Sequence, residues 1–225
     1  MANGLKYDGR GNIVAADHGS KRVTRFNTLT RAMEVLTEIY EGHPYGGPND
    51  VCLDLNGNVY FTDPGGSSPE NPIGGIYRID VDANNRLTEV KQIEESQVFP
   101  NGLAVHPDGK RFYFANSWLN QIVGYDLASD GNLSNRHVAV QLPNDTVDGI
   151  MFDEYDRLWV ARWANGTVDV VNVDKGEVLA SYPAGGTNVT NLCWWETTLY
   201  VTVAGAHAIH RFDVGVRSAR IVPGQ

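Results

Sequence analysis

The sequence predicts an all-β protein, a β-propeller of four-stranded blades with five blades in this chain. Three observations support this fold class. A short phrase recurs five times along the 225 residues, at intervals in the forties to low fifties. The segments between its copies are short, β-rich runs bounded by Gly, Asn and Asp, which favour tight turns. No amphipathic helical segment separates these runs, so βαβ units are excluded.

Each copy of the phrase begins with an Asn or Asp, which we call the anchor. The anchor is often followed by Gly, and then come apolar residues, an Asp, a Gly turn and a β-rich run. The anchors are Asn3, Asn49, Asn101, Asp148 and Asn191. A period of this length, filled with short strands and turns, is typical of one propeller blade.

Four strands are expected in each unit, with the first strand beginning at the anchor. A more polar fourth strand closes the unit, and the segment 30–40 is expected to be such a strand rather than a helix. The third strands are expected at 75–80, 121–126, 167–172 and 208–213. The units begin near 3, 49, 101, 148 and 191 and no linker interrupts them, so a single domain over 1–225 is expected.

The composition excludes several classes of function. The net charge is −9, and no cluster of cations is longer than the pair Lys21-Arg22. Phosphate contacts need clustered Lys and Arg, so neither nucleic acid nor an anionic membrane surface is an expected partner. We find no transmembrane run and no signal peptide, and therefore expect a cytoplasmic protein.

The first strand of each propeller blade lines the central channel, so anchors at one register are expected to converge on one site. Amide oxygens and a carboxylate are hard donors, which suit Ca²⁺ or another oxygen-preferring divalent ion. The alternative is that each Asn or Asp only forms a turn. The metal interpretation is favoured for the set as a whole, because the same residue types recur at one register.

Several phrases resemble the senescence-marker protein/gluconolactonase/luciferin-regenerating family, and the resemblance covers essentially the whole chain. They are Pro48-Asn49-Asp50-Val51, Phe61-Thr62-Asp63-Pro64, Pro100-Asn101-Gly102-Leu103, Asp148-Gly149 and Arg211-Phe212-Asp213-Val214-Gly215. The resemblance implies a six-bladed propeller that hydrolyses lactones with one divalent cation in its channel. Related members hydrolyse organophosphate esters.

By position, the resemblance implies that Asn101 and Asp148 are metal ligands. It also implies that Asn49 binds substrate or the metal, and that Asp148 is the general base or the nucleophile. Calcium is the expected ion, with Zn²⁺, Mg²⁺ and Mn²⁺ as alternatives. Further residues that either line the mouth of the site or pack within the blades are His18, Tyr45, Asp63, Trp118, Arg162 and Trp163.

One feature departs from the family pattern. Members carry a further blade before the segment matching Asn3, and a Glu in that blade is a metal ligand. Three explanations stay open: a truncated gene product, a five-bladed ring, or an open propeller whose exposed strand edges pair with a second copy to form a homodimer. Without that Glu, Asp148 is the one charged anchor, and Asp63, Asp50 and Glu41 are candidate substitutes.

The sequence therefore leads to a metal-dependent hydrolase of small-molecule lactones. Two alternatives stay open: a non-catalytic propeller that acts as a binding module, and an organophosphate triester hydrolase that uses the same site. A serine hydrolase is not expected, because the chain contains no Gly-x-Ser-x-Gly signature.

Overall fold

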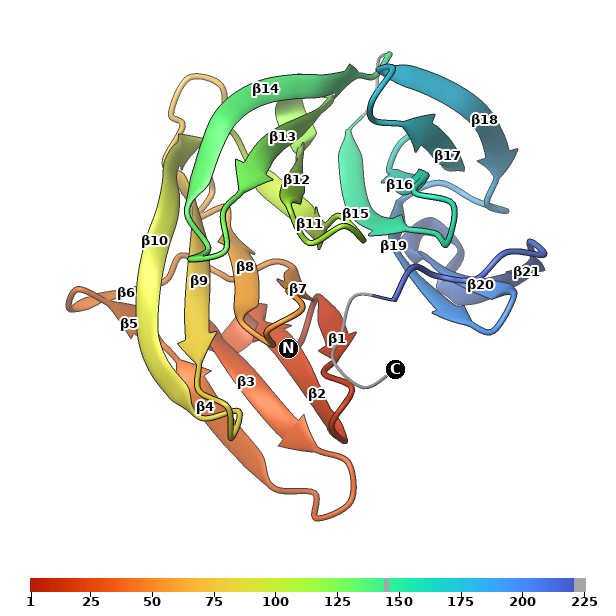
Figure 1. The fold of residues 1–225 in the computed structure, drawn as a ribbon. Coiled ribbons are helices and arrows are strands. Elements are labelled where there is room, and N and C mark those ends of the chain that lie inside the picture. The colour runs from red at the N-terminus through yellow and green to blue at the C-terminus, as the bar shows by residue number, and fades with distance from the viewer. Residues whose placement is uncertain (144–145, 221–225) are drawn as a thin grey trace. The chain divides into compact units, whose positions relative to one another are not determined.

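The computed structural model describes residues 1–143 and 146–220, and nearly all of its regular structure is β (Figure 1). Within these residues the strands form five successive antiparallel sheets of the β-propeller blade type, in which strands adjacent in sequence pair with one another. This confirms the predicted fold class. The chain divides into two compact units, residues 1–105 and residues 106–220. The prediction of one domain over the whole chain stays a prediction.

The first unit contains two complete sheets. The first sheet consists of β1 (Leu5–Tyr7), β2 (Asn12–Asp17), β3 (Arg22–Asn27) and β4 (Met33–Thr37), in that order. The second consists of β7 (Val51–Leu53), β8 (Val59–Asp63), β9 (Gly74–Val81) and β10 (Leu87–Gln97). The small hairpin of β5 (Ile39–Tyr40) and β6 (His43–Pro44) lies between them in sequence, and β11 (Pro100–Val105) ends the unit. Within segment 30–40, residues 33–37 form the predicted fourth strand, and residues 39–40 belong to the hairpin.

The second unit contains the remaining strands. Three of them follow β11 in the third blade: β12 (Arg111–Asn116), β13 (Gln121–Leu127) and β14 (Leu133–Gln141). The fourth sheet is β15 (Val147–Phe152), β16 (Leu158–Arg162), β17 (Thr167–Asn172) and β18 (Glu177–Pro183). The last sheet has three strands in the described part of the chain: β19 (Val189–Trp195), β20 (Thr198–Val203) and β21 (Ala208–Asp213).

Short 3-10 turns follow three of the second strands: η1 (His18–Ser20), η2 (Ser117–Leu119) and η3 (Ala204–Ala206). Among the residues that the structure describes, no helix has the length and apolar character needed to cross a membrane.

Apolar side chains between neighbouring sheets form the core of each unit. In the first unit, Val14, Val23 and Leu36 of the first sheet pack against Phe61 and Ile79 of the second. In the second unit the fourth and fifth sheets pack in the same way, around Trp159, Trp194, Leu199 and Val201. Fully burying an apolar side chain of this kind is worth about 1.5–3 kcal/mol, so these contacts between sheets are a major source of stability.

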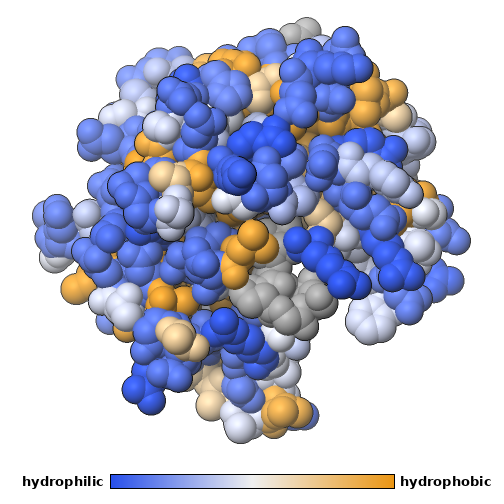
Figure 2. Space-filling model, in the orientation of Figure 1, coloured by the Kyte–Doolittle hydropathy of each residue, from blue (hydrophilic) through white to orange (hydrophobic). Residues whose placement is uncertain are grey.

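Apolar side chains also remain on the surface. The face shown in Figure 2 is mostly hydrophilic, with hydrophobic patches between. On the first sheet, the register places Tyr7 opposite Ile13, Ile13 opposite Phe26, and Phe26 opposite Met33. Tyr7, Phe26 and Met33 are exposed. This exposed apolar face thus lies on the first sheet. The predicted homodimer through exposed blade edges stays a prediction.

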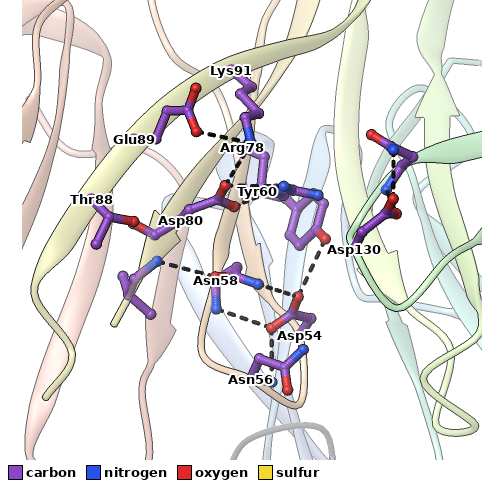
Figure 3. Close-up of polar contacts among 12 residues, drawn as sticks. Asp54, Asn56, Asn58, Tyr60, Arg78, Asp80, Thr88, Glu89, Lys91 and Asp130 are labelled. Carbon is purple, nitrogen blue, oxygen red and sulfur yellow. Dashed lines mark hydrogen bonds and ion pairs between the residues drawn. The ribbon is translucent and has the colours of Figure 1, made fainter. Parts of the chain in front are cut away.

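The recurring Asp that follows the first strand has a clear structural reason. Asp54 accepts hydrogen bonds from the backbone N–H groups of Asn56 and Asn58 and from the Asn58 amide, at 2.8–3.0 Å (Figure 3). Asp8 and Asp153 make the same pair of backbone contacts in their own turns. A carboxylate at this position holds the hairpin closed, which explains why the phrase repeats.

In the third sheet the position directly after the first strand, β11, is occupied by His106 instead of an Asp. Only 2% of His106 is exposed. Arg111 Nη2 lies 2.7 Å from His106 Nε2. An arginine can only donate, so a ring nitrogen of His106 accepts from Arg111, and Nδ1 lies close to both the backbone N–H of Asp108 (3.2 Å) and Asp108 Oδ2 (3.1 Å). Burial, followed by the charge of Arg111, lowers the pKa of His106, against the smaller opposing effects of Asp108 and Asp156. The native protein therefore holds this ring neutral.

A neutral buried histidine makes stability depend on pH. The lowered pKa means that the unfolded chain binds this proton more readily, so stability from this group is complete above the unfolded value of about 6.5 and falls as the pH drops below it. We expect the melting temperature of the native protein to fall more between pH of about 7.5 and 5.5 than that of His106→Asn. The exposed His207→Asn variant is the control. Equal pH dependence in all three proteins would contradict the assignment.

Candidate active site

Strand register identifies the anchor of each blade independently of the sequence phrase. In four of the sheets, the residue that lies two positions before the end of the second strand has a partner in the first strand. This partner is Leu5, Val51, Ile150 and Leu192, in sheet order. Stepping back two residues from these partners gives the anchors of the four sheets: Asn3, Asn49, Asp148 and Thr190. Three predicted anchors therefore share one register, and the last does not.

The predicted anchor Asn191 is wrong by one residue. The Asn191 N–H donates to Thr202 Oγ1 at 2.8 Å, just as the Asp50 N–H donates to Thr62 Oγ1 at 3.1 Å. Asn191 thus corresponds to Asp50, the residue after an anchor. The sequence contains a signal for this: every other anchor is separated from its apolar residue by one position, whereas Leu192 follows Asn191 directly.

The glycine that follows several anchors is required by the approach of the neighbouring first strand. A Cβ atom on Gly4 would lie 2.6 Å from Asp50 Cα, and one on Gly149 would lie 2.9 Å from Asn191 Cα. Carbon atoms cannot approach this closely without moving backbone. The Gly4 N–H also donates to the Asn49 carbonyl at 2.9 Å. Neighbouring first strands therefore approach most closely beside the anchors.

Asn49 and Asn101 belong to the first unit, and their backbones are fixed by Thr62. The Asn49 N–H donates to the Thr62 carbonyl at 2.8 Å, and Thr62 Oγ1 donates to the Asn101 carbonyl at 2.8 Å. Asn49 is half-buried and Asn101 is 6% exposed. Because both backbones bond to one buried residue, their positions relative to each other are well defined.

The Asn101 side chain is one of several with a buried polar atom for which the described residues provide no hydrogen bond. Its Oδ1 is buried and makes no hydrogen bond with any residue that the structure describes. Leaving a buried acceptor unsatisfied costs about 1–3 kcal/mol, so such atoms need an explanation, and an absent ion is one. An amide oxygen is a ligand that a hard cation prefers. Asn101 therefore fits the role of metal ligand.

Asp148 lies in the second unit, half-buried near the start of β15. In the described parts of the chain, no three His, Cys, Asp or Glu side chains gather to hold a metal ion, around Asp148 or elsewhere. The predicted ligand set has one such residue, Asp148, and two amides. Its chemistry suits Ca²⁺ better than Zn²⁺, which prefers nitrogen and sulfur.

Asp63 and His18 hold the loop that leads to Asn49. The Asp63 carboxylate accepts the N–H groups of Gly46 and Gly47, both at 2.7 Å. His18 Nδ1 lies 3.2 Å from the Gly47 carbonyl, which can only accept. Asp63 is buried and His18 is exposed. Both residues therefore help to fix the conformation of this loop.

Tyr45 lies inside the core of the first unit. Its ring packs edge-on against Phe61 and Tyr77, with centroids 5.1 and 5.2 Å away. Its hydroxyl lies 2.9 Å from Thr37 Oγ1. Burial is the main reason that the pKa of Tyr45 is raised to about 12. Tyr45 is thus a packing residue, one of the two roles that the sequence left open for it.

In the second unit, Trp118 in η2 is 50% exposed and Arg162 at the end of β16 is 0% exposed. Arg162 forms an ion pair with Asp169, with Nη1 and Oδ2 2.5 Å apart. Trp118 is accessible to a ligand, and so is Trp163, which follows Arg162 in sequence, whereas Arg162 is not. Of the candidate substitutes for the missing carboxylate, Glu41 is exposed and Asp50 is buried.

Comparison with known proteins places the chain in one protein family. A family model described as the SMP-30/Gluconolactonase/LRE-like region matches residues 2–205. The gluconolactonase of Zymomonas mobilis is 26% identical over 244 residues, covering 93% of this chain and 62% of that enzyme. The diisopropyl-fluorophosphatase of Loligo vulgaris is 26% identical over 197 residues, covering 80% of this chain and 61% of that enzyme. The chain thus spans less than two thirds of either relative.

Solved structures agree on the fold. One described as a putative gluconolactonase is 25% identical, with a TM-score of 0.83 over 97% of this chain and 76% of that chain. The calcium-binding protein regucalcin from Agrobacterium tumefaciens is 20% identical, with a TM-score of 0.79 over 99% of this chain and 79% of that chain.

The role of Asp63 can be tested by stability. Asp63→Ala removes the acceptor of two backbone N–H groups, one of them in a buried contact, so we expect a loss of about 1–3 kcal/mol of unfolding free energy. Asp82→Ala is the matched control, because Asp82 also accepts two backbone N–H groups but in an exposed turn. Chemical denaturation measures both. Equal losses in the two variants would contradict a special role for Asp63 in this loop.

Proposed function

The chain belongs to the SMP-30/gluconolactonase/LRE-like family, and from that premise we propose that it acts in the hydrolysis of lactones with the help of one divalent cation. The observation that carries the proposal is the buried Oδ1 of the anchor Asn101, which has no hydrogen-bond partner among the described residues. The gluconolactonase similarity supports the choice of substrate class. The chain spans less than two thirds of these relatives, so their activity is carried over to it only as a proposal.

The proposed ligands are the amide oxygens of Asn49 and Asn101 and the carboxylate of Asp148. Calcium is the proposed ion, since the donors are all oxygens and a structural neighbour, regucalcin, is a calcium-binding protein. Zn²⁺, Mg²⁺ and Mn²⁺ are the alternatives. When bound, such an ion polarises a carbonyl group and stabilises the negative charge that develops on its oxygen.

The chain's own residues supply the proton transfer. Hydrolysis adds the oxygen of water to the lactone carbonyl carbon and breaks the ring C–O bond, so that a carboxyl and a hydroxyl group are formed. In the proposal Asp148 takes the proton of the attacking water, and this proton is passed to the ring oxygen as the C–O bond breaks. Alternatively Asp148 attacks the carbonyl carbon itself, the ring oxygen leaves and takes a proton from solvent, and water then hydrolyses the resulting mixed anhydride. Trp118, half exposed in η2, is the proposed contact for the substrate in the second unit.

A second candidate is the hydrolysis of organophosphate triesters, favoured by the similarity to diisopropyl-fluorophosphatase. It uses the same ligands and the same carboxylate, and differs only in the electrophile. A panel of lactones and phosphotriesters, assayed side by side, distinguishes the two activities. Activity toward neither class, with or without added metal, would favour a non-catalytic binding module.

Asp148 and the cation can be tested by activity. We expect hydrolysis of gluconolactone and aryl lactones to require Ca²⁺ or another of the four ions, and to stop with chelator. Asp148→Asn should lower kcat by about 10²–10⁴-fold, the usual contribution of a general base. Asp130→Asn, in an exposed turn, is the control. Activity that is indifferent to both chelator and Asp148→Asn would contradict the proposal.

Asn101 gives a test that needs no substrate. In chelator, Asn101→Ala should cost the protein little stability, because it removes a buried acceptor that has no partner among the residues described in the structure. With excess Ca²⁺, the native protein should gain stability in proportion to the logarithm of the calcium concentration over Kd, and the variant should gain less. Melting curves of both proteins measure this. Equal calcium gains would exclude Asn101 as a ligand.

A further inference from the structure

We infer that Arg162, together with Asp169, is a positioning residue that fixes the strand carrying Asp148. The inference deepens the function proposed for Asp148 and rests on it. All the residues that carry it lie in the second unit, within the fourth sheet, its preceding loop and η2.

Arg162 contacts two residues that precede Asp148, Pro143 and Val147, and links them to the rest of the sheet. In the β15–β16 ladder Arg162 pairs directly with Val147, the residue before Asp148. Its Nη2 donates to the Pro143 carbonyl at 2.5 Å, and its Nη1 donates to Asp169 Oδ2 at 2.5 Å. One side chain thus bonds to Pro143, which precedes β15, and through Asp169 to β17.

Asp169 is itself held on its other oxygen. Its Oδ1 accepts hydrogen bonds from Ser181 Oγ at 2.6 Å and Thr167 Oγ1 at 3.2 Å. Asp169 is buried, and Ser181 lies on the neighbouring strand β18. Because both carboxylate oxygens are engaged, the carboxylate cannot rotate freely, and the guanidinium bound to it is fixed in turn.

A second contact holds the same backbone from the third blade. Ser117 Oγ in η2 donates to the Val147 carbonyl at 2.5 Å, and both residues are buried. Val147 is therefore fixed by its ladder partner Arg162 and by the hydroxyl of Ser117. Asp148 follows it directly, so these two contacts fix the backbone from which its side chain extends.

The fold alone does not require an arginine at this position. The second strands of the sheets end at Asp17, Asp63, Asn116, Arg162 and Val203. Val203 is fully buried at the end of β20, so an apolar residue is acceptable there. A buried ion pair contributes little to stability compared with apolar residues of similar volume, because both charges must be desolvated. The Arg162–Asp169 pair therefore calls for a role other than stability.

The test uses a variant that keeps the packing and removes the charges. In Arg162→Met/Asp169→Leu, we expect faster amide hydrogen exchange, by about tenfold or more, in Val147–Gly149, with unchanged exchange over β19–β21. Under the proposed function, kcat for lactone hydrolysis should fall at least about tenfold with KM changed by less than about twofold, as expected for loss of transition-state positioning.

Arg157→Met is the matched control, because Arg157 forms an ion pair with Asp153 in the same sheet, with Nη2 and Oδ2 2.7 Å apart. It should change neither the exchange of Val147–Gly149 nor kcat. Unchanged exchange in the double variant, or faster exchange over the whole unit, would overturn the inference. So would faster local exchange with an unaltered kcat. If the native protein hydrolyses no lactone, the proposed function fails, and the exchange result alone decides whether Arg162 positions this strand.

Discussion

The close approach of neighbouring first strands beside the anchors is the constraint on which the rest of the structure depends. In the first unit Gly4 lies against Asp50, and in the second Gly149 lies against Asn191, with no room for a Cβ atom. This approach lets a backbone N–H of one sheet bond to the next, as Gly4 does to Asn49. It also sets the register of each anchor relative to its neighbour. Within each unit, the positions of the anchors are therefore a consequence of how the sheets pack.

Much of this could be predicted from sequence, because the repeat is built from local rules. Turn-forming Asp residues such as Asp54 act within a few residues of themselves, so their spacing is visible in the chain. What escaped prediction depends on contacts distant in sequence. Tyr45 and Arg162 have polar atoms that suggest a site, yet packing buries both of them. Thr62, which links the backbones of Asn49 and Asn101, carries no motif of its own.

The proposed chemistry depends on a small number of charges. Among the anchors of the described sheets only Asp148 is a carboxylate, and the others offer neutral oxygens. A neutral ligand contributes less to binding a divalent ion than a carboxylate does, so the placement of each oxygen matters more. The structure meets this need with buried contacts that fix backbone: Thr62 for Asn101, Asp63 for the loop before Asn49, and the Arg162–Asp169 pair for Asp148.

The central claim is that Asn49, Asn101 and Asp148 bind one cation, and paramagnetic NMR tests it most directly. Substoichiometric Mn²⁺ broadens resonances of nuclei near the ion. The claim predicts selective loss of the side-chain amide signals of Asn49 and Asn101 and of the Gly149 backbone amide, all reversed by excess Ca²⁺. The side-chain amide of Asn132, in an exposed turn, should be unaffected. Broadening confined to surface carboxylates, or none at these three residues, would contradict the claim.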